Sequence, residues 1–299
     1  MLGESLDYRI LRALAHSRNR YTEEELDAKD CSSLMAHEVE TKLPSVIARF
    51  GGHFPLDPEL RYLDMGCGSG ELTIGLAKLG LQHLVGVDFL PRFVEAARRN
   101  ANAAGIARRT QFICADLRTW QPESKFDVLL SFDAFEHIGN PGAFLVRMRD
   151  FLAPGGVAVV SFGPLFHSPF GDHMGGFFRV PVPWRGALFS EKAMLRVRRE
   201  CYRPTDPGQT YADIAGGLNG MRYSEFLAYV REAGWRFRSL RVNQFTRHPA
   251  LTVVAGRLGG IPILRNYCIH NVYAVMEAAE IVSAVRPAKA KETTHAAVP

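Results

Sequence analysis

The segment LDMGCGSGEL, residues 63–72, decides the fold. It continues a short apolar run, passes through Gly66, Gly68 and Gly70, and enters a stretch with helical spacing of its apolar residues. Glycines are needed where the backbone takes a positive φ or where a ligand lies against the main chain. A strand that ends in such a loop before a helix is where open α/β sheets bind nucleotides. The segment therefore predicts the first βα unit of a parallel sheet, with a ligand at its carboxyl edge.

The same alternation of strand and helix continues from residue 61 to residue 163. Short β-rich runs separate stretches of helical period, two of which end at a glycine, as helices commonly do. We expect strands at RYLDMG, LVGVDF, TQFICAD, FDVLLSF and GVAVVSF, and helices at GELTIGLAKLG, LPRFVEAARRNANAAG and PGAFLVRMRDFLAPGG. This order predicts βαβ units and a parallel sheet with helices on both faces.

The chemistry around the glycines indicates which ligand the loop binds. The spacing is G-x-G-x-G rather than the G-x-G-x-x-G of dinucleotide sites, and Asp64 stands two residues ahead. An acid here would repel a pyrophosphate, but it suits a ligand with a cationic amino group. Asp88, at the end of the second expected strand, is placed to accept hydrogen bonds from ribose hydroxyls. These features favour S-adenosylmethionine (SAM), whose ammonium and sulfonium groups are both cationic, over NAD.

Residues 61–163 resemble the core of the class I SAM-dependent methyltransferases of the small-molecule type. The resemblance rests on LDMGCGSG, VGVDFL, CADL and FDVLLSFDAFEHI in this order, and on LAPGG as the turn before the fifth strand. It implies a Rossmann-like, doubly wound α/β fold with seven strands, mostly parallel, whose last strand at 266–278 inserts antiparallel beside strand five.

The resemblance also implies which residues bind SAM. Asp88 is expected at the ribose, and Asp116 with Leu117 at the adenine. Aspartates at strand ends can also simply cap turns, but three of them arriving together favour a site. The expected SAM-binding residues are Asp64, Gly66, Cys67, Gly68, Gly70, Asp88, Phe89, Asp116, Leu117, Ser131 and Phe132.

The remaining segments are expected to surround this core. Prolines and aromatic residues interrupt the periodicity after residue 163, which predicts a substrate lid with one helix near 190–201. A helix at 223–234 and a strand at 235–245 follow, with an apolar connector at 250–264. The predicted division is an N-terminal helical cap at 1–55, the SAM-binding core at 56–163, the lid at 164–222, the C-terminal part of the core sheet at 223–280 and a disordered tail at 281–299.

Two motifs with histidine are expected near the methyl donor. His137, in FEHI, either moves the acceptor's proton or packs against the cofactor. The segment FHSPFGDH, residues 166–173, follows strand five, and its His167, Asp172 and His173 could form a base oriented by a carboxylate, a metal site, or only a polar turn. We predict His137, His167, Asp172 and His173 as catalytic candidates. We predict no metal, because H-x5-H has no fixed face on a helix or strand.

Composition narrows the class of protein and its partners. The net charge of +5 over 299 residues comes without a clustered basic face, which predicts no nucleic-acid partner. Five widely spaced cysteines without a C-x-x-C pair fit a reducing cytoplasm. No apolar run approaches the roughly 20 residues of a membrane span. A cytoplasmic protein is therefore expected, with its oligomeric state left open.

The expected function is methyl transfer from SAM to a small organic molecule of biosynthetic or secondary metabolism. A hydroxyl is favoured as the acceptor group over an amine or a carbon, because SFDAFEH stands where enzymes that methylate exocyclic amines carry N-P-P-Y or D-P-P-Y. Aromatic residues of the lid indicate an apolar or aromatic acceptor. The alternatives are a lipid or quinone precursor as acceptor, an RNA or protein methyltransferase, and a SAM-binding module without catalysis.

Overall fold

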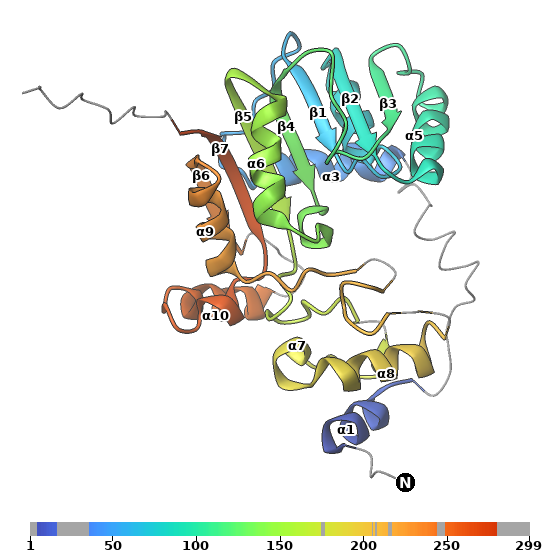
Figure 1. Cartoon of the computed structure of the whole chain (residues 1–299), viewed down its shortest axis with the longest axis vertical. Helices are drawn as coiled ribbons and strands as arrows, with labels where there is room; N and C mark the ends of the chain where they lie inside the picture. Colours follow the sequence, from blue (N-terminus) through green and yellow to red (C-terminus); the bar gives the residue numbers. More distant parts are fainter. Residues whose placement is uncertain are drawn as a thin grey trace, which may run out of the picture.

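The centre of the protein is a seven-stranded sheet of strand order β3-β2-β1-β4-β5-β7-β6 (Figure 1). The computed structural model describes residues 5–16, 36–174, 177–204, 206, 208–214, 217–243 and 249–279, so the expected tail at 281–299 lies outside the described residues. The strands are β1 (Arg61–Met65), β2 (His83–Asp88), β3 (Thr110–Cys114), β4 (Phe126–Phe132), β5 (Leu152–Phe162), β6 (Trp235–Val242) and β7 (Val272–Ala278).

Strand directions confirm the predicted fold class. The strands β1 to β5 pair in parallel, β7 pairs antiparallel with β5, and β6 pairs antiparallel with β7. The central strands are apolar on both faces, as in a sheet covered by helices on both sides, whereas in the edge strand β6 only Trp235 is buried and the other residues are partly or fully exposed. The carboxyl ends of β1, β2 and β4 therefore meet at one edge of the sheet.

Helices cover the two faces with separate apolar clusters. One cluster joins Leu43, Ile74 and Val94 to one face of the sheet, and the other joins Leu145 and Phe226 to the opposite face. The helices that supply these residues are α3 (Ala36–Ala48), α4 (Glu71–Lys78) and α5 (Pro91–Ala103) on the first face, and α6 (Pro141–Phe151) and α9 (Tyr223–Glu232) on the second.

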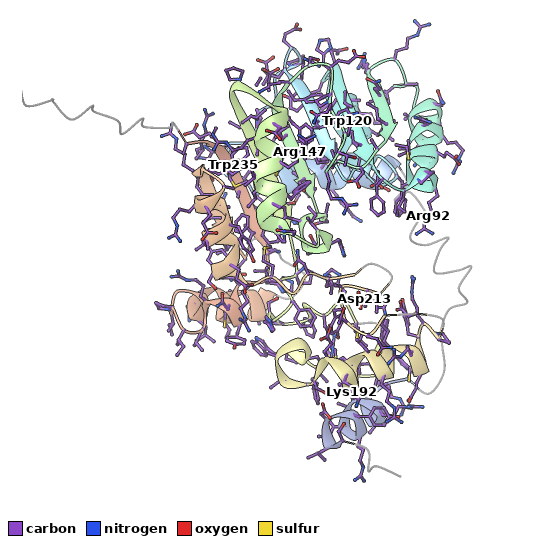
Figure 2. All side chains as sticks on the ribbon, in the orientation of Figure 1. Arg92, Trp120, Arg147, Lys192, Asp213 and Trp235 are labelled. Carbon is purple, nitrogen blue, oxygen red and sulfur yellow. The ribbon has the colours of Figure 1, made fainter. Side chains whose placement is uncertain are left out.

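Helix α6 is held on the sheet by polar contacts at both of its sides (Figure 2). The Arg147 guanidinium donates to the backbone oxygens of Leu117, at 3.2 Å, and of Trp120. The Trp235 indole, from β6, donates to the backbone oxygen of Leu145 at 2.8 Å. These bonds fix the loop that follows β3, where the adenine is expected, relative to the middle of the sheet.

The lid has a core of its own, which includes the first helix of the chain. The helix α1 (Leu6–Leu14) packs on α8 (Glu191–Cys201), and Ala15 forms a β-bridge with Phe178 (Figure 1). Leu11 and Met194 are fully buried in this cluster. The two helices described within residues 1–55 therefore pack in different places, α1 in the lid and α3 on the sheet.

Three details of the sequence analysis differ from the structure. The last strand begins only at Val272, because Arg265–Cys268 forms the short helix α11. Most of the segment expected to be an apolar connector forms the helix α10 (Pro249–Gly259). The sequence did not predict this helix because its apolar residues lack a clear helical period. The LAPGG segment lies within β5, although the register with β4 shifts there and Gly155 turns the chain at φ 78°.

Candidate active site

The glycine loop after β1 is tied to the end of β2. The backbone N–H groups of Gly66 and Cys67 donate to the backbone oxygen of Val87, at 2.8 and 3.1 Å. Gly66, Gly68 and Gly70 have φ values of 82°, 51° and 89°, and a Cβ on Gly70 would lie 3.0 Å from Phe112. Glycine is therefore needed for both the loop's conformation and its packing.

Asp88 joins this loop to the loop after β2. One carboxylate oxygen accepts the N–H of Gly68 at 3.1 Å, and the other accepts the N–H of Leu90 at 2.9 Å. The side chain is 8% exposed at the carboxyl edge of the sheet, and Phe89 beside it is 68% exposed. The carboxylate thus lies at the carboxyl edge of the sheet beside an exposed aromatic ring, and its contact with the ribose stays a prediction.

Asp64 is a buried acid directly before the glycines. Its carboxylate accepts a hydrogen bond from the Thr73 hydroxyl at 2.7 Å. Burial, together with the nearby Glu71 and Asp88 carboxylates, raises the pKa of Asp64 to about 7. A cationic group of a ligand next to Asp64 would relieve this cost. The glycine cradle and the buried acid both fit a ligand with the ammonium group of SAM.

The other expected SAM-binding residues follow β3 and β4. Asp116 accepts three hydrogen bonds from the Arg118 guanidinium, at 2.6 to 3.0 Å, which hold the pKa of this carboxyl below its usual range. The Leu117 side chain is partly buried against the apolar core, and its backbone oxygen accepts the hydrogen bond from Arg147 of α6. The contact of these two residues with adenine stays a prediction.

Residues at the end of β4 pack partly into the apolar core. The Phe132 ring packs 5.5 Å from the ring of Phe50 and 6.3 Å from that of Phe54, measured between centroids. Ser131 is fully buried, and its hydroxyl has no hydrogen-bond partner among the residues that the structure describes. Cys67 is buried as well, and burial raises the pKa of its thiol.

His137 and His173 meet beyond the end of β4. His137 closes the short 3-10 helix η1 (Phe135–His137), and its Nδ1 lies 2.7 Å from the backbone oxygen of Gly217. The ring centroids of the two histidines are 5.8 Å apart. Desolvation and the neighbouring His137 lower the pKa of His173 to about 4, although its side chain keeps contact with solvent. Near pH 7 the His173 imidazole is therefore neutral, with one ring nitrogen able to accept a hydrogen bond from an acceptor hydroxyl.

Asp172 and His167 lie apart from this pair. Asp172 is 1% exposed, and its two oxygens accept hydrogen bonds from the Arg185 guanidinium at 2.6 and 2.7 Å. Its visible contacts thus fix the lid, and its expected role of orienting His173 stays a prediction. His167 is half-buried, with its ring centroid 5.1 Å from that of Phe166 and 6.2 Å from that of Tyr267.

Two acids beside His137 were not among the expected site residues. Glu136 is 5% exposed, one of its oxygens accepts the N–H of Gly163 at 3.3 Å, and the other has no partner among the described residues. Burial and the nearby Asp133 raise the pKa of Glu136 to about 8. Asp133 itself has a φ of 47°. The sequence signal was the segment DAFEH, in which only the histidine was considered.

A pocket of about 380 Å³ opens between the start of the lid, α8 and the loop before α9. His167, Phe166, Tyr211 and Met194 contribute to its lining. Asn219, also in the lining, donates from its side chain to the backbone oxygens of Phe135 and Ile138, both at 2.9 Å. The pocket wall is therefore bonded to the segment that carries Glu136 and His137.

The described residues contain no group of three or more histidine, cysteine, aspartate or glutamate side chains that could hold a metal ion. In the same residues no helix is long and apolar enough to cross a membrane.

Part of the chain is similar in sequence to known methyltransferases. Residues 63–156 match the family described as a methyltransferase domain. A ubiquinone biosynthesis O-methyltransferase of Cereibacter sphaeroides is 36% identical over 102 residues, which cover 34% of this chain and 40% of that protein. The chain thus spans well under half of the length of this relative.

Two solved structures have a similar fold. A SAM-dependent methyltransferase from Mesorhizobium loti matches with a TM-score of 0.50 and 17% identity, over 79% of this chain and 96% of that one. The [4+2]-cyclase SpnF matches with the same TM-score and 16% identity, over 91% and 94% of the two chains. Residues 63–156 therefore match a methyltransferase domain, and the sheet that contains them has the fold of SAM-dependent methyltransferases.

Proposed function

We propose that the chain transfers the methyl group of SAM to a hydroxyl of a small organic molecule. The observation that carries the proposal is the His137–His173 pair, which lies beyond β4 and is joined through Gly217 to the loop that lines the pocket. Methyl transfer from a sulfonium is an in-line displacement, and a hydroxyl acceptor must lose its proton as the new C–O bond forms. The neutral His173, paired with His137 next to the loop that lines the pocket, is the candidate that takes this proton.

Each part of the site then has a separate task. Bound SAM supplies the methyl group on its sulfonium. Asp64 and the glycine loop face the amino-acid part of SAM, Asp88 the ribose, and Asp116 with Leu117 the adenine. The more buried Ser131 and Phe132 shape the floor of the donor site. His173, neutral near pH 7, receives the proton, and the His137 ring packs edge-on against it, with 5.8 Å between the two ring centroids.

The pocket supports an apolar or aromatic acceptor. A volume of about 380 Å³ suits a drug-sized molecule rather than a strand of RNA or a protein side chain on its backbone. Relatives named ubiquinone biosynthesis O-methyltransferases support a quinone precursor as the acceptor over a product of secondary metabolism. Because those matches cover only 34 to 40% of this chain, the proposed identity of the acceptor is supported by the pocket as much as by the relatives.

A different reaction on the same fold is the alternative that the structural comparison supports. The cyclase match has the same TM-score as the methyltransferase match, so the fold by itself does not require methyl transfer. What favours transfer is the presence of two imidazoles next to a pocket, which a module that only binds SAM does not need.

The test is incubation of the protein with methyl-labelled SAM and three acceptor sets: catechols with and without a prenyl tail, total RNA and total protein. We expect label on a catechol hydroxyl, located by mass analysis. Label in RNA or protein, or tight SAM binding without transfer to any set, would overturn the proposal.

The histidines are tested next with the accepted catechol. We expect His173→Gln to lower kcat by about 10²- to 10⁴-fold with an unchanged Kd for SAM, since removing a proton acceptor has effects of this size. The control is His83→Gln, an exposed histidine at the opposite end of β2. Unchanged kcat in both His173→Gln and His137→Gln would remove the base role from this pair.

A further inference from the structure

Among the described residues, exposed large apolar side chains are most concentrated along the chain between β6 and β7. Five of the thirteen large apolar side chains with high exposure fall within residues 253–267. These five define what we call the α10–α11 surface: Val253 (54% exposed), Val254 (50%), Ile261 (45%), Ile263 (80%) and Tyr267 (41%). Isolated exposed apolar residues are ordinary, but a cluster of this kind marks an interaction surface.

The segment that carries the α10–α11 surface contains charges of one sign only. Residues 243–276 contain no aspartate or glutamate, while Arg247, Arg257 and Arg265 are present. Arg257 is exposed on α10 itself. The neighbouring α9 adds both signs, because Arg222 precedes it and Glu225 lies in its first turn. The surface is therefore apolar with a basic excess.

This combination matches the interface of an anionic lipid bilayer. Apolar side chains enter the boundary between headgroups and acyl chains, and arginine is attracted to anionic headgroups. Tyrosine is enriched at the same depth because its ring is amphipathic. No described helix is long enough to cross a bilayer, so contact with the bilayer would be along its surface.

The α10–α11 surface also borders the pocket. The backbone oxygen of Tyr267 accepts the Trp184 indole N–H at 2.6 Å, and the Tyr267 ring lies 6.2 Å from that of His167. His167 lines the pocket. Figure 1 shows α10 and α7 (Arg185–Leu188) along the same side of the molecule, away from the helix α5. A bilayer on this side would lie next to the wall of the pocket.

We propose that the α10–α11 surface docks on the surface of an anionic lipid bilayer. The proposal concerns where the protein lies and does not depend on methyl transfer. A second copy of the chain, or another protein, would use the apolar side chains equally but would not require the exclusion of acids.

Flotation with lipid vesicles tests the proposal on the full chain without SAM. We expect binding to vesicles of 70% phosphatidylcholine and 30% phosphatidylglycerol, and much weaker binding to pure phosphatidylcholine. The double variant Val254→Asp/Ile263→Asp should bind at least about tenfold more weakly. Arg257→Gln should lose about fivefold, on the anionic vesicles only, since one basic residue near such a surface contributes about that factor.

The matched control is Val146→Asp, which makes the same change at a 55% exposed position on α6. It should bind vesicles like the wild type. Thermal unfolding and SAM affinity check that each variant is folded, and the single variant Ile263→Asp, at 80% exposure, replaces the double variant if that one is unstable. The proposal is overturned if wild type ignores anionic vesicles, if the aspartate variants bind them unchanged, or if the variants lose only a concentration-dependent dimer.

Discussion

The donor side of the protein and its lid are built in opposite ways. The donor side consists of loops that follow consecutive strands, and its contacts are made by backbone N–H groups and by acids at strand ends, such as Asp88 with Gly68. The lid, at 164–222, contains long irregular segments, and buried charges hold it together with its apolar core; Asp172 and Arg185 are both about 1% exposed. The comparison teaches that the first site is specified by local sequence, and the second by contacts between distant residues.

The largest expected effect comes from breaking the buried pair of Asp172 and Arg185 in the lid. Arg185→Met leaves the Asp172 carboxylate buried without its partner, so we expect a loss of about 3 to 5 kcal/mol in the free energy of unfolding of the lid. Hydrogen exchange over residues 177–201 should report the loss, while SAM affinity stays unchanged.

The double variant Asp172→Leu/Arg185→Met should recover most of this stability, because it removes both charges. The control is Arg231→Met, whose carboxylate partner Glu232 is 4.0 Å away on the exposed face of α9; it should cost less than about 1 kcal/mol. Equal losses in Arg185→Met and Arg231→Met would contradict the role assigned to the buried pair.

On the donor side, Asp88→Ala should lower the affinity for SAM by about 100-fold with a small effect on the lid. The variant removes the acceptor for two backbone N–H groups and the expected partner of the ribose, and bonds to a charged group contribute about 1.5 to 3 kcal/mol each. Calorimetric titration measures the Kd. Asp127→Ala is the control, since Asp127 also accepts a backbone N–H but at the other edge of the sheet. A similar loss in both variants would mean that the effect is on folding.

Glu136 lies at the junction of the two regions, and its effect depends on pH. Its folded pKa of about 8 is raised above the ordinary value of 4.5, so the folded state prefers the protonated form. Protonated Glu136 contributes stability that is fully present below the unfolded pKa of 4.5. This stability is lost as the pH rises through the folded pKa of about 8. Glu136→Gln should therefore gain stability relative to wild type as the pH rises from about 5 to about 8, by at least about 2 kcal/mol. The exposed Glu95→Gln, on α5, should show no such trend in urea denaturation; a trend of the same size there would refute the explanation.

The smallest effect concerns the charge of Asp64. Because its pKa is about 7 in the free protein and the ionised form suits a ligand ammonium, affinity for S-adenosylhomocysteine should rise about threefold to fivefold between about pH 6 and pH 8. Asp64→Asn should bind more weakly and lose this slope. If the asparagine variant keeps the slope, the titrating group is elsewhere.

The same contrast explains what the sequence could predict. The parallel strands, the glycine loop and Asp88 were predictable because each depends on a short apolar run and the residues directly after it. The contact of His137 with His173 was not predictable, because the two histidines are 36 positions apart in the chain. The contact also depends on the backbone conformation at His173, where φ is 55°.

The burial and pairing of charged residues in the lid could not be predicted from the sequence either. Asp172 stands next to His173 in the chain, which suggested a joint role, but its hydrogen bonds go to Arg185, 13 residues further on in an irregular segment. Burial of Glu136 likewise depends on packing that no local pattern encodes. Helix α10 was missed because valine, threonine and glycine residues give it neither a helical period nor a high helix propensity.

The position of β7 has a consequence for the growing chain. This strand is the last one described, yet it lies between β5 and β6, so both neighbours have an open edge until residues 272–278 have left the ribosome. Open edges invite pairing with other chains. Arg236 and Arg238 lie on β6 and pair with Glu277 once β7 is in place. Until then, their unpaired charges would act as gatekeepers that keep nascent chains from adding to one another.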